Sequence, residues 1–425
     1  METTYKKLKE GVFFRGIRDT RFKNMSIAVH ILTPLLKETA SDNAFIPSLL
    51  LRALREYPDY TELNRRLCDL YGAMLSSHVD RCGNIQILSV SASCIADDYT
   101  LYGEKLSEEI SKMLCSMVFN PLLDENGAFL EEGFQIERRQ LLEQLDAEIN
   151  DKRLYARRKC VSMLLRDEKL CDSKFGERDI LEKVTGKSAA DALFKLLKEA
   201  RIEICAIGNC EPERVLDAFM PYVDKLERDF KDNFVFETAK PLPLLEKTEE
   251  MDVVQAKLVM GFQTGTNSLS KENHALRLAA TIFGGSPNSK LFLHVREEKS
   301  LCYYCSVLFD SHLGTLMVDS GVDAEKADEA KNEIMHQLSL MQNGEFTDDE
   351  IEIAKLYLTD SYRTVFDFIS GLDTWYLYRT FFDEIPTPEE VSEIINNITR
   401  EEIIEVSKKL SLCAVYYLSG GENDE

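Results

Sequence analysis

The feature of this sequence that most restricts its fold is a repeated order of secondary-structure signals in its two halves. Strand-like apolar runs at 25–34 and 256–265 each lead through a short polar loop into an apolar helical stretch. β-rich stretches follow at 84–95 and 313–323, bounded by glycine and charged residues. Strands clustered before paired helices, twice over, predict two α+β domains of the same design rather than one large core.

The rest of each half continues the repeat. Long amphipathic helical regions come next, at 99–166 and 324–382, and each half closes with a helix and an apolar strand. Between the halves, residues 232–251 contain two prolines, mixed charge and no helical period, which is typical of a linker. We therefore expect an N-terminal domain over 1–231 and a C-terminal domain over 252–425.

The composition excludes several classes of function. The chain has 51 Lys and Arg against 74 Asp and Glu, a formal net charge of −23, which disfavours binding to nucleic-acid phosphates. No stretch approaches the ~20 apolar residues of a membrane span, and the N-terminal residues do not resemble a signal peptide. The 11 cysteines are scattered among apolar segments, as in reduced proteins. These features predict a cytoplasmic location with neither nucleic acid nor membrane as partner.

One short stretch, "NSKLFLHVREEKSLCYYCS", resembles a metal site. His294, Glu297 and Glu298 read H-x-x-E-E, one residue short of the inverted zinc-protease signature H-x-x-E-H. Cys302 and Cys305 follow in an alternating stretch that predicts a strand, where residues three apart face opposite sides. We therefore expect no shared ligand and no disulfide from these two thiols, and a structural role for His294.

The histidines as a set give little support to a metal centre. No two of them are spaced i, i+3 or i, i+4 along the chain. They are His30, His78, His274, His294, His312 and His336. A site assembled through space from residues distant in sequence stays open as an alternative.

Three segments in the same order resemble the pitrilysin/insulinase family of metallopeptidases, and the resemblance covers nearly the whole chain. They are "YPDYTELNRRLCDLYGA" (57–73), "IERRQLLEQLDAEINDKRLYARRK" (136–159) and "SKLFLHVREEKSLCYYCS" (289–306). The resemblance implies two homologous α+β domains, each a mostly antiparallel sheet packed with helices as in LuxS/peptidase-like metalloenzymes. It also implies that these domains face each other around a cavity.

The family's catalytic chemistry needs two histidines at i and i+4 on one helix, a glutamate between them as general base, and a distant glutamate as third zinc ligand. The resemblance places the H-x-x-E-H slot on Ala44-Phe45-Ile46-Pro47-Ser48 and the distant ligand on Gln144. Ala44, Pro47, Ser48 and Gln144 therefore mark a degenerate site. Glu143 is adjacent, but points about 100° away on a helix. We expect no metal, no cofactor and no catalytic residue here.

Pro47 also bears on where this helix starts. Proline is tolerated near a helix start but disrupts an interior turn. The sequence therefore predicts that the helix begins between Asn43 and Pro47.

Two residues of the second half match the family's substrate-contacting pair. Arg296 and Tyr303 occupy the positions at which the resemblance implies contact with the peptide backbone. The alternative is structural: an arginine paired with Glu297 or Glu298, and a tyrosine packed in the sheet. Ser300 stands where the family usually has glycine, which would alter the turn that aims Tyr303.

The resemblance favours a non-catalytic homologue that acts as an accessory or regulatory subunit. Its expected partner is an active H-x-x-E-H paralogue, forming a heterodimer that handles peptides or unfolded polypeptides. A stand-alone peptide-binding protein without hydrolysis is the alternative, and an active peptidase with a displaced site is the third hypothesis. Metal analysis separates the third from the other two, and the presence of a partner separates the first two.

Overall fold

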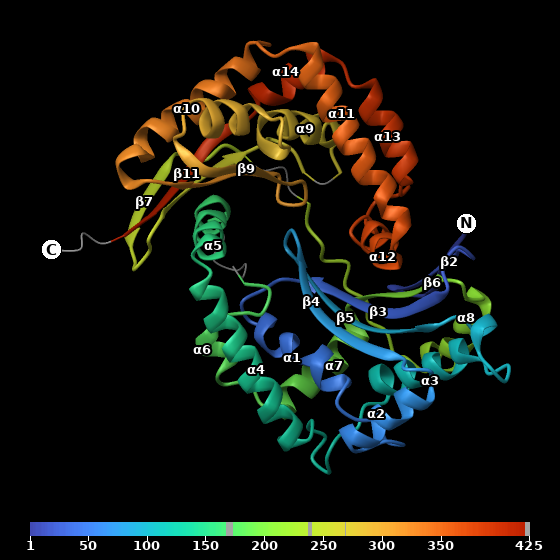
Figure 1. Cartoon of the computed structure of the whole chain (residues 1–425). Helices are drawn as coiled ribbons and strands as arrows, with labels where there is room; N and C mark the ends of the chain where they lie inside the picture. The colour runs from blue at the N-terminus through green and yellow to red at the C-terminus, as the bar shows by residue number, and fades with distance from the viewer. Residues whose placement is uncertain (167–172, 237–239, 268, 421–425) are drawn as a thin grey trace. The chain divides into compact units, whose positions relative to one another are not determined.

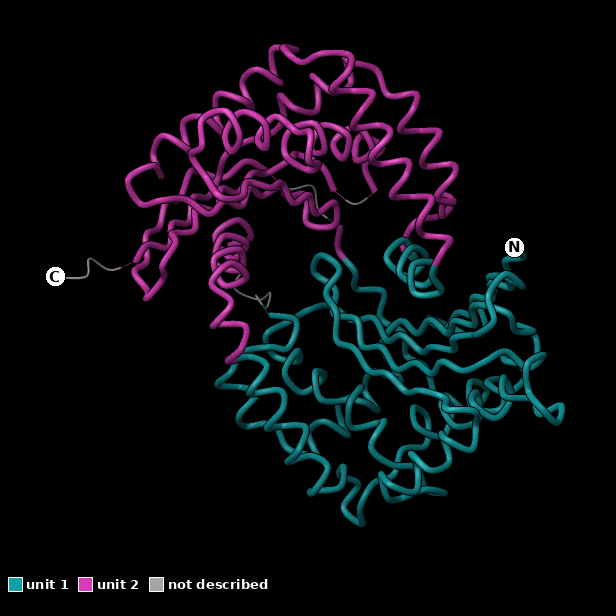
Figure 2. Tube along the Cα trace, viewed as in Figure 1, with its two compact units in different colours: residues 1–145, 169–234, 368–380 teal, residues 146–168, 235–367, 381–425 magenta. Residues whose placement is uncertain are grey.

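The computed structural model describes residues 1–166, 173–236, 240–267 and 269–420 (Figure 1). The chain divides into two compact units (Figure 2). Unit 1 comprises Met1–Leu145, Lys169–Phe234 and Phe368–Thr380. Unit 2 comprises Asp146–Glu168, Val235–Asp367 and Phe381–Glu425.

Unit 1 is built on a six-stranded mixed sheet in the order β1-β2-β6-β3-β5-β4. Its strands are β1 (Glu2–Lys9), β2 (Val12–Arg18), β3 (Asn24–Pro34), β4 (Met74–Cys82), β5 (Ile85–Ile95) and β6 (Arg201–Gly208). β2 and β6 run parallel, and the other neighbouring strands are antiparallel. β4 therefore forms one edge of this sheet.

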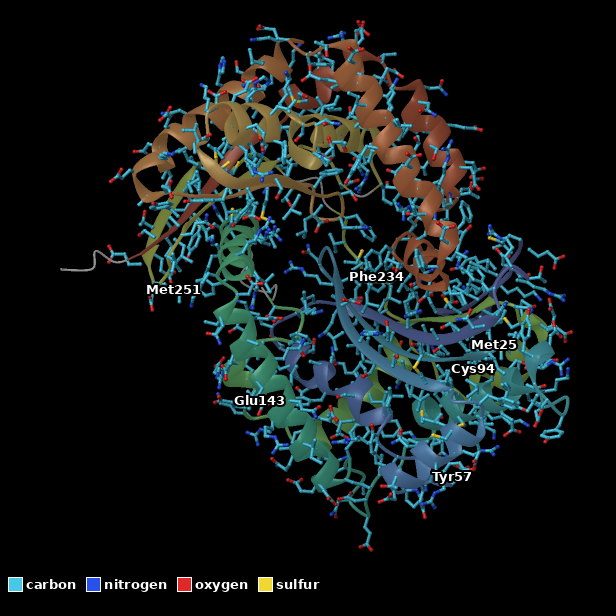
Figure 3. The ribbon with its side chains drawn as sticks, in the orientation of Figure 1. Met25, Tyr57, Cys94, Glu143, Phe234 and Met251 are labelled. Carbon is cyan, nitrogen blue, oxygen red and sulfur yellow. The ribbon has the colours of Figure 1, made fainter. Side chains whose placement is uncertain are left out.

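Helices cover one face of this sheet and form the core there. The helical elements of unit 1 are α1 (Ala40–Leu50), α2 (Tyr60–Asp69), η1 (Asp97–Tyr99), α3 (Leu106–Phe119), most of α4 (Glu131–Asn150), α6 (Arg178–Leu181), α7 (Gly186–Glu199), α8 (Pro212–Val223) and α12 (Ile369–Leu377). Val29 and Ile31 of β3 are buried in the core with α1, α3, α7 and α8. Met25 of β3 lies opposite Cys94 of β5 in the same cluster (Figure 3). Each large apolar side chain fully buried here stabilises the unit by about 1.5–3 kcal/mol.

Unit 2 contains a five-stranded sheet in the order β7-β11-β8-β10-β9. Its strands are β7 (Leu245–Glu250), β8 (Ala256–Gln263), β9 (Cys302–Asp310), β10 (Thr315–Val322) and β11 (Ser411–Ser419). Its helical elements are α5 (Lys152–Leu165), α9 (Asn273–Ala280), the π-helices η2 (Thr281–Gly285) and η3 (Leu291–Glu298), η4 (Ala324–Lys326), α10 (Ala327–Gln342), α11 (Asp348–Arg363), η5 (Thr364–Asp367), α13 (Pro388–Asn397) and α14 (Arg400–Lys408). Three of them, α11, α13 and α14, begin at a T-x-x-E capping box, in which threonine and glutamate each satisfy a free backbone N–H.

The strand order confirms the predicted repeat. β2-β6-β3-β5-β4 of unit 1 matches β7-β11-β8-β10-β9 of unit 2, position by position. The directions also agree, because β7 runs parallel to β11 as β2 does to β6, and the other pairs are antiparallel. The predicted α+β fold of two homologous domains is therefore present.

Each unit includes one helix from the other half of the sequence. α5, from the first half, packs on β8 and β11 of unit 2 through an apolar stripe that includes Ala156, Cys160 and Leu164. α12, from the second half, contacts β6 of unit 1. The sequence boundaries predicted at 1–231 and 252–425 did not anticipate this reciprocal exchange of helices.

Two local features differ from expectation. α1 begins at Ala40, before Asn43, and contains Pro47 in its interior. The helix ends at Leu50, so Pro47 lies in its last turn and removes a single hydrogen bond there. β7 lies inside the stretch predicted as a linker, of which residues 237–239 fall outside the described residues.

None of the helices within the described ranges combines the length and apolar character that a membrane crossing requires.

Candidate functional site

The four degenerate positions lie on one pocket of unit 1. Its volume is about 270 Å³, and α1, α4, β4 and a short turn at 174–175 form its walls. The lining residues are Ala44, Pro47 and Ser48 of α1, Ser77, His78, Val79 and Asp80 of β4, Glu137, Gln140, Leu141 and Gln144 of α4, and Lys174 and Phe175. Residues 100 positions apart in sequence therefore share one small cavity.

The geometry of α1 explains why the expected H-x-x-E-H positions face the pocket. Ala44 and Ser48 are i and i+4 on one helix, so their side chains lie one above the other on the same face. Ser48 Oγ donates to the carbonyl of Phe45 within its own helix, at 3.1 Å. An alanine methyl and a hydroxyl bound to backbone cannot replace two imidazoles as ligands.

On α4, two neighbouring residues differ in direction as a helix requires. Gln144 lines the pocket with a neutral amide. Glu143, labelled in Figure 3, is exposed and lies 4.0 Å from Arg139 in an i, i+4 pair. The carboxylate next to the ligand position therefore does not reach the pocket.

The charged groups in the pocket are largely engaged with one another. Glu137 pairs with Arg52 at 2.9 Å, and these side chains are 13% and 22% exposed. Asp80 pairs with Lys174 at 3.4 Å. The groups left to contact a ligand are mostly uncharged donors and acceptors, among them Gln144, which suits a peptide backbone more than a metal ion.

Lys174 is held in place by a buried glutamine. Gln86 of β5 is fully buried and donates to the carbonyls of Lys174 (2.7 Å) and Ala40 (3.0 Å). Gly176 then turns with φ of 88°, and a Cβ there would lie 2.7 Å from the backbone nitrogen of Ser41. This turn therefore needs glycine to approach α1 so closely. Sequence reasoning missed Lys174, because nothing in the local pattern connects this turn with α1.

β4 gives the pocket an open strand edge. Within the described residues it pairs with β5 alone and is the outermost strand of its sheet. His78 is exposed, and most of its neighbours are half-buried. Its edge backbone groups can therefore accept an added extended segment. His78 and Asp80 were not identified from the sequence, because β4 lacks the apolar alternation that predicts strands.

In unit 2, Arg296 and Tyr303 are both accessible. Arg296 lies on η3, 3.6 Å from Glu297, with its guanidinium 4.6 Å from the ring centre of Phe292. Tyr303 is 60% exposed and donates to Asp323 at 3.1 Å; this bond raises the pKa of Tyr303. The ion pair fits the structural alternative for Arg296, whereas Tyr303 is not packed in the sheet. Substrate contact by either residue stays a prediction.

Ser300 has a backbone conformation that glycine adopts more readily. Its φ of 50° lies in the left-handed region, where residues with a Cβ are uncommon. Lys326 Nζ donates to its carbonyl at 3.1 Å. This φ is compatible with the glycine that the resemblance expects at this position.

The prediction that Cys302 and Cys305 face opposite sides of the strand was wrong. Tyr304 pairs with Gly321 and Cys302 with Val322, so Tyr303 is an extra residue in a β-bulge. The bulge brings both buried thiols to one side, where they hydrogen-bond to each other and lower the pKa of Cys302. His294 likewise has a local partner, because its Nδ1 lies 2.7 Å from Glu298 Oε2.

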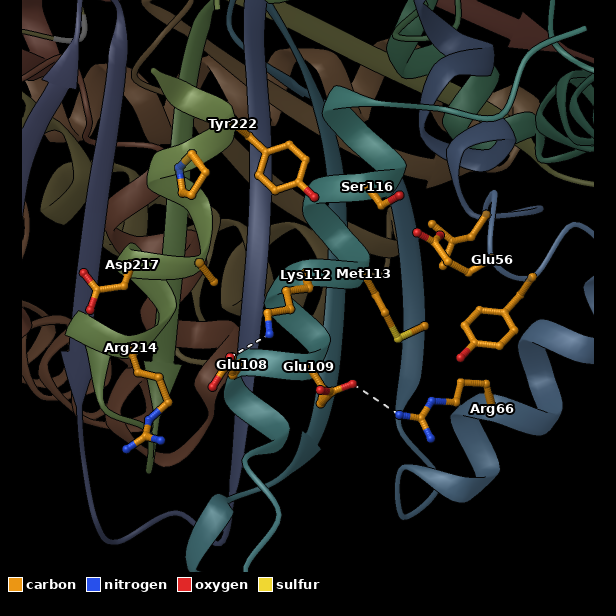
Figure 4. Close-up of a pocket in the computed structure, with 14 residues that line it drawn as sticks. Glu56, Arg66, Glu108, Glu109, Lys112, Met113, Ser116, Arg214, Asp217 and Tyr222 are labelled. Carbon is orange, nitrogen blue, oxygen red and sulfur yellow. Dashed lines mark hydrogen bonds and ion pairs between the residues drawn. The ribbon is translucent and has the colours of Figure 1, made fainter. Parts of the chain in front are cut away.

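A larger depression of about 670 Å³ lies elsewhere on unit 1, between α2, α3 and α8 (Figure 4). Arg66 pairs with Glu109 at 3.2 Å and Lys112 with Glu108 at 2.6 Å along its walls (Figure 4). None of the predicted site residues lines it, namely Ala44, Pro47, Ser48, Gln144, Arg296 and Tyr303. Its pairs are exposed, so we interpret it as a solvated, charged surface.

Comparisons with known proteins agree with this geometry. Residues 183–358 match the family described as "Peptidase M16 inactive domain". A "Probable inactive metalloprotease YmfF" of Bacillus subtilis is 27% identical over 410 residues, covering 96% of this chain and 95% of the relative. The chain is therefore similar to the M16 (pitrilysin/insulinase) metallopeptidases, and to relatives that are described as inactive. Ala44, Pro47 and Ser48, which stand at the expected H-x-x-E-H positions, agree with a non-catalytic pseudo-peptidase.

Two further similarities support this conclusion. An "Uncharacterized zinc protease YmxG", also of Bacillus subtilis, is 25% identical over 268 residues, 61% of this chain and 62% of that relative. The crystal structure of a conserved protein from Enterococcus faecalis superposes with a TM-score of 0.91 at 28% identity, covering 100% of each chain. The chain therefore has a fold found in a solved structure over its whole length.

Proposed function

We propose that this M16 homologue is a non-catalytic subunit that holds peptide segments in the α1/α4/β4 pocket for an active H-x-x-E-H partner. The observation that carries the proposal is the pocket itself. The positions that lost their ligands still enclose about 270 Å³, lined by Ser48, Ser77 and Gln144. A pocket with no remaining use would gain stability by filling with larger apolar side chains.

The edge of β4 supplies the second element of peptide recognition. An extended segment that adds to an open strand edge gains backbone hydrogen bonds, while pockets beside the edge select its side chains. Ser77 to Asp80 of β4 line the pocket directly. The strand edge and the pocket thus act on the same peptide.

The partner is supported by the distribution of relatives. Bacillus subtilis contains both a relative named as an inactive metalloprotease and one named as a zinc protease. One organism thus carries relatives named for each type, as a heterodimer requires. The acidic character of this chain, with its net charge of −23, favours basic or unfolded peptides over nucleic acids.

Filling the pocket should weaken peptide binding. Gln144→Trp places an indole in a cavity of about 270 Å³ and is expected to weaken the binding of an unstructured peptide at least about ten-fold. Glu143→Trp is the matched control, since it makes the same change on the adjacent, exposed position. Fluorescence anisotropy with labelled peptides measures both. Equal affinities in the two variants would remove the pocket from the proposal.

Arg296 and Tyr303 provide an independent test of substrate contact. If Arg296 donates a charge-assisted hydrogen bond to peptide, Arg296→Ala should weaken binding or partner-dependent cleavage by about ten-fold or more, or roughly 1.5–3 kcal/mol. If it forms only its exposed pair with Glu297, stability falls by about 0–1 kcal/mol and binding is unchanged. Peptide affinity and thermal unfolding, measured on Arg296→Ala and Tyr303→Phe, distinguish these cases. Parental binding by both variants would exclude the substrate role.

A stand-alone peptide-binding protein is the second candidate. It is favoured by one observation: the pocket and the strand edge both belong to unit 1 of this single chain. Under this hypothesis the purified chain binds peptide with the same affinity whether or not a partner is present. Under the subunit hypothesis the partner increases the affinity or converts binding to cleavage.

A further inference from the structure

Three ligand-type side chains from three elements converge on the face of the unit 1 sheet that α12 contacts. The ligand atoms of His30 (β3), Cys205 (β6) and Asp373 (α12) all lie within 4.8 Å of one another. His30 is 3% and Cys205 4% exposed. We propose that these three residues form a binding site for one zinc-type divalent cation, which fastens α12 to the sheet.

Strand register explains the meeting of the first two ligands. β3 and β6 pair antiparallel with His30 opposite Glu203 and Ala28 opposite Cys205, so His30 and Cys205 are diagonal neighbours on one face. Asp373 Oδ1 approaches from α12 to 3.2 Å from His30 Nε2. Tetrahedral zinc, with bonds of about 2.0–2.3 Å, needs ligand atoms roughly 3.3–3.8 Å apart. Small side-chain movements therefore suffice to complete the site.

Ser89 orients the imidazole for this role. Its Oγ lies 2.8 Å from His30 Nδ1, on the strand directly opposite in β5. Metal-bound histidines usually donate their second ring N–H to an oxygen in this way, which fixes the tautomer. With Nδ1 held by Ser89, Nε2 points to the space that Asp373 and Cys205 share.

The donor set and the charges suit zinc. Imidazole nitrogen, thiolate sulfur and carboxylate oxygen are the three ligand types that zinc accepts, and two anionic ligands neutralise its charge. The positive charge of Arg15 acts on both Cys205 and Asp373. Because zinc with these two anionic ligands has no net charge, Arg15 does not repel the complex. Binding releases the Cys205 thiol proton to solvent. The fourth position falls to water, on the side where Asp373 is 24% exposed.

Glu203, a buried carboxylate on the neighbouring strand position, already accepts hydrogen bonds from other residues. Glu203 Oε1 accepts from Thr380 Oγ1 at 2.6 Å and from Tyr5 Oη at 3.2 Å. None of the three proposed ligands lines the degenerate M16 pocket, so this site is separate from the proposed peptide-binding function. It would join residues 343 positions apart, and so secure a helix that comes from the other half of the sequence.

Metal binding by the full chain tests the site. Protein purified without chelator should contain about one zinc per chain, and the stripped protein should take up one Zn²⁺ or Co²⁺. Co²⁺ should give the near-ultraviolet absorption of a cobalt–thiolate bond, and Zn²⁺ should raise the melting temperature. Cys205→Ser should lose the absorption and bind at least about ten-fold more weakly. Cys68→Ser, which changes an exposed thiol, should behave as the parent.

Two results would overturn the proposal. One is a parent protein that takes up no metal at about 100 µM free Zn²⁺, which corresponds to a binding free energy weaker than roughly 5.5 kcal/mol. This measurement uses the parent protein, so it does not depend on the folding of a variant. The other is full metal retention by both Cys205→Ser and Asp373→Asn. In either case the cluster is a buried His30–Asp373 ion pair without a metal.

Discussion

Replacing Arg153 and Arg157 together by methionine is expected to lower the free energy of unfolding by about 3–5 kcal/mol. Asp319 of β10 has no exposed side-chain surface. Its Oδ2 accepts from Arg153 Nε at 2.6 Å and from Arg157 Nε at 2.7 Å. Without both guanidiniums a carboxylate is left buried beneath α5, which is far more costly than the loss of an exposed pair. Chemical denaturation followed by circular dichroism measures the change.

Two controls make this result specific. Adding Asp319→Leu to the double variant removes the unpaired charge and should recover stability to within about 1–2 kcal/mol of the parent. Arg139→Met breaks a 4.0 Å pair whose side chains are about 70% exposed, and should change stability by less than about 0.5 kcal/mol. A double variant as stable as Arg139→Met would contradict the packing of α5 on the unit 2 sheet.

Restoring the lost ligands is expected to create a tight zinc site. Ala44→His, Pro47→Glu, Ser48→His and Gln144→Glu together rebuild H-x-x-E-H and its distant glutamate on the walls of one pocket. The variant should bind one additional zinc with a Kd below about 1 µM, or more than roughly 8 kcal/mol. Isothermal titration in a Cys205→Ser background, which weakens the other proposed zinc site, separates this binding from that of His30, Cys205 and Asp373.

The third ligand provides the control for this variant. Omitting Gln144→Glu leaves no carboxylate at the distant-ligand position of α4, because Glu137 is paired with Arg52 and Glu143 points to solvent beside Arg139. Zinc affinity should then fall at least about ten-fold. If the complete set binds no zinc, or binds it no better than the incomplete set, the assignment of this pocket to the M16 metal position is wrong.

The sequence predicted those strands that combine burial with apolar alternation. β3, β5, β8 and β10 follow such runs closely, and the order of these runs predicted the repeat. The edge strands β4 and β7 were missed, because a strand with one open edge and polar faces has no periodic apolar signal. α1 was placed too late, because a proline in the last turn of a short helix costs less than one in its middle.

Tertiary features were out of reach for physical reasons. The apolar stripe of α5 predicts a buried face, but not which of two similar sheets it covers. Ala44, Ser48 and Gln144 could be found because helical spacing and motif order are local. Lys174 could not, because its turn meets α1 through tertiary contacts such as the buried Gln86, which is distant in sequence.

Purification of the chain under native conditions, from the cells that make it, tests the proposed role most directly. The proposed subunit role predicts that a second chain, which carries H-x-x-E-H, purifies with this chain in about equal amount. It also predicts chelator-sensitive peptide cleavage that disappears when the second chain is removed. A chain that purifies alone, or that cleaves peptides by itself in a chelator-sensitive manner, would contradict it.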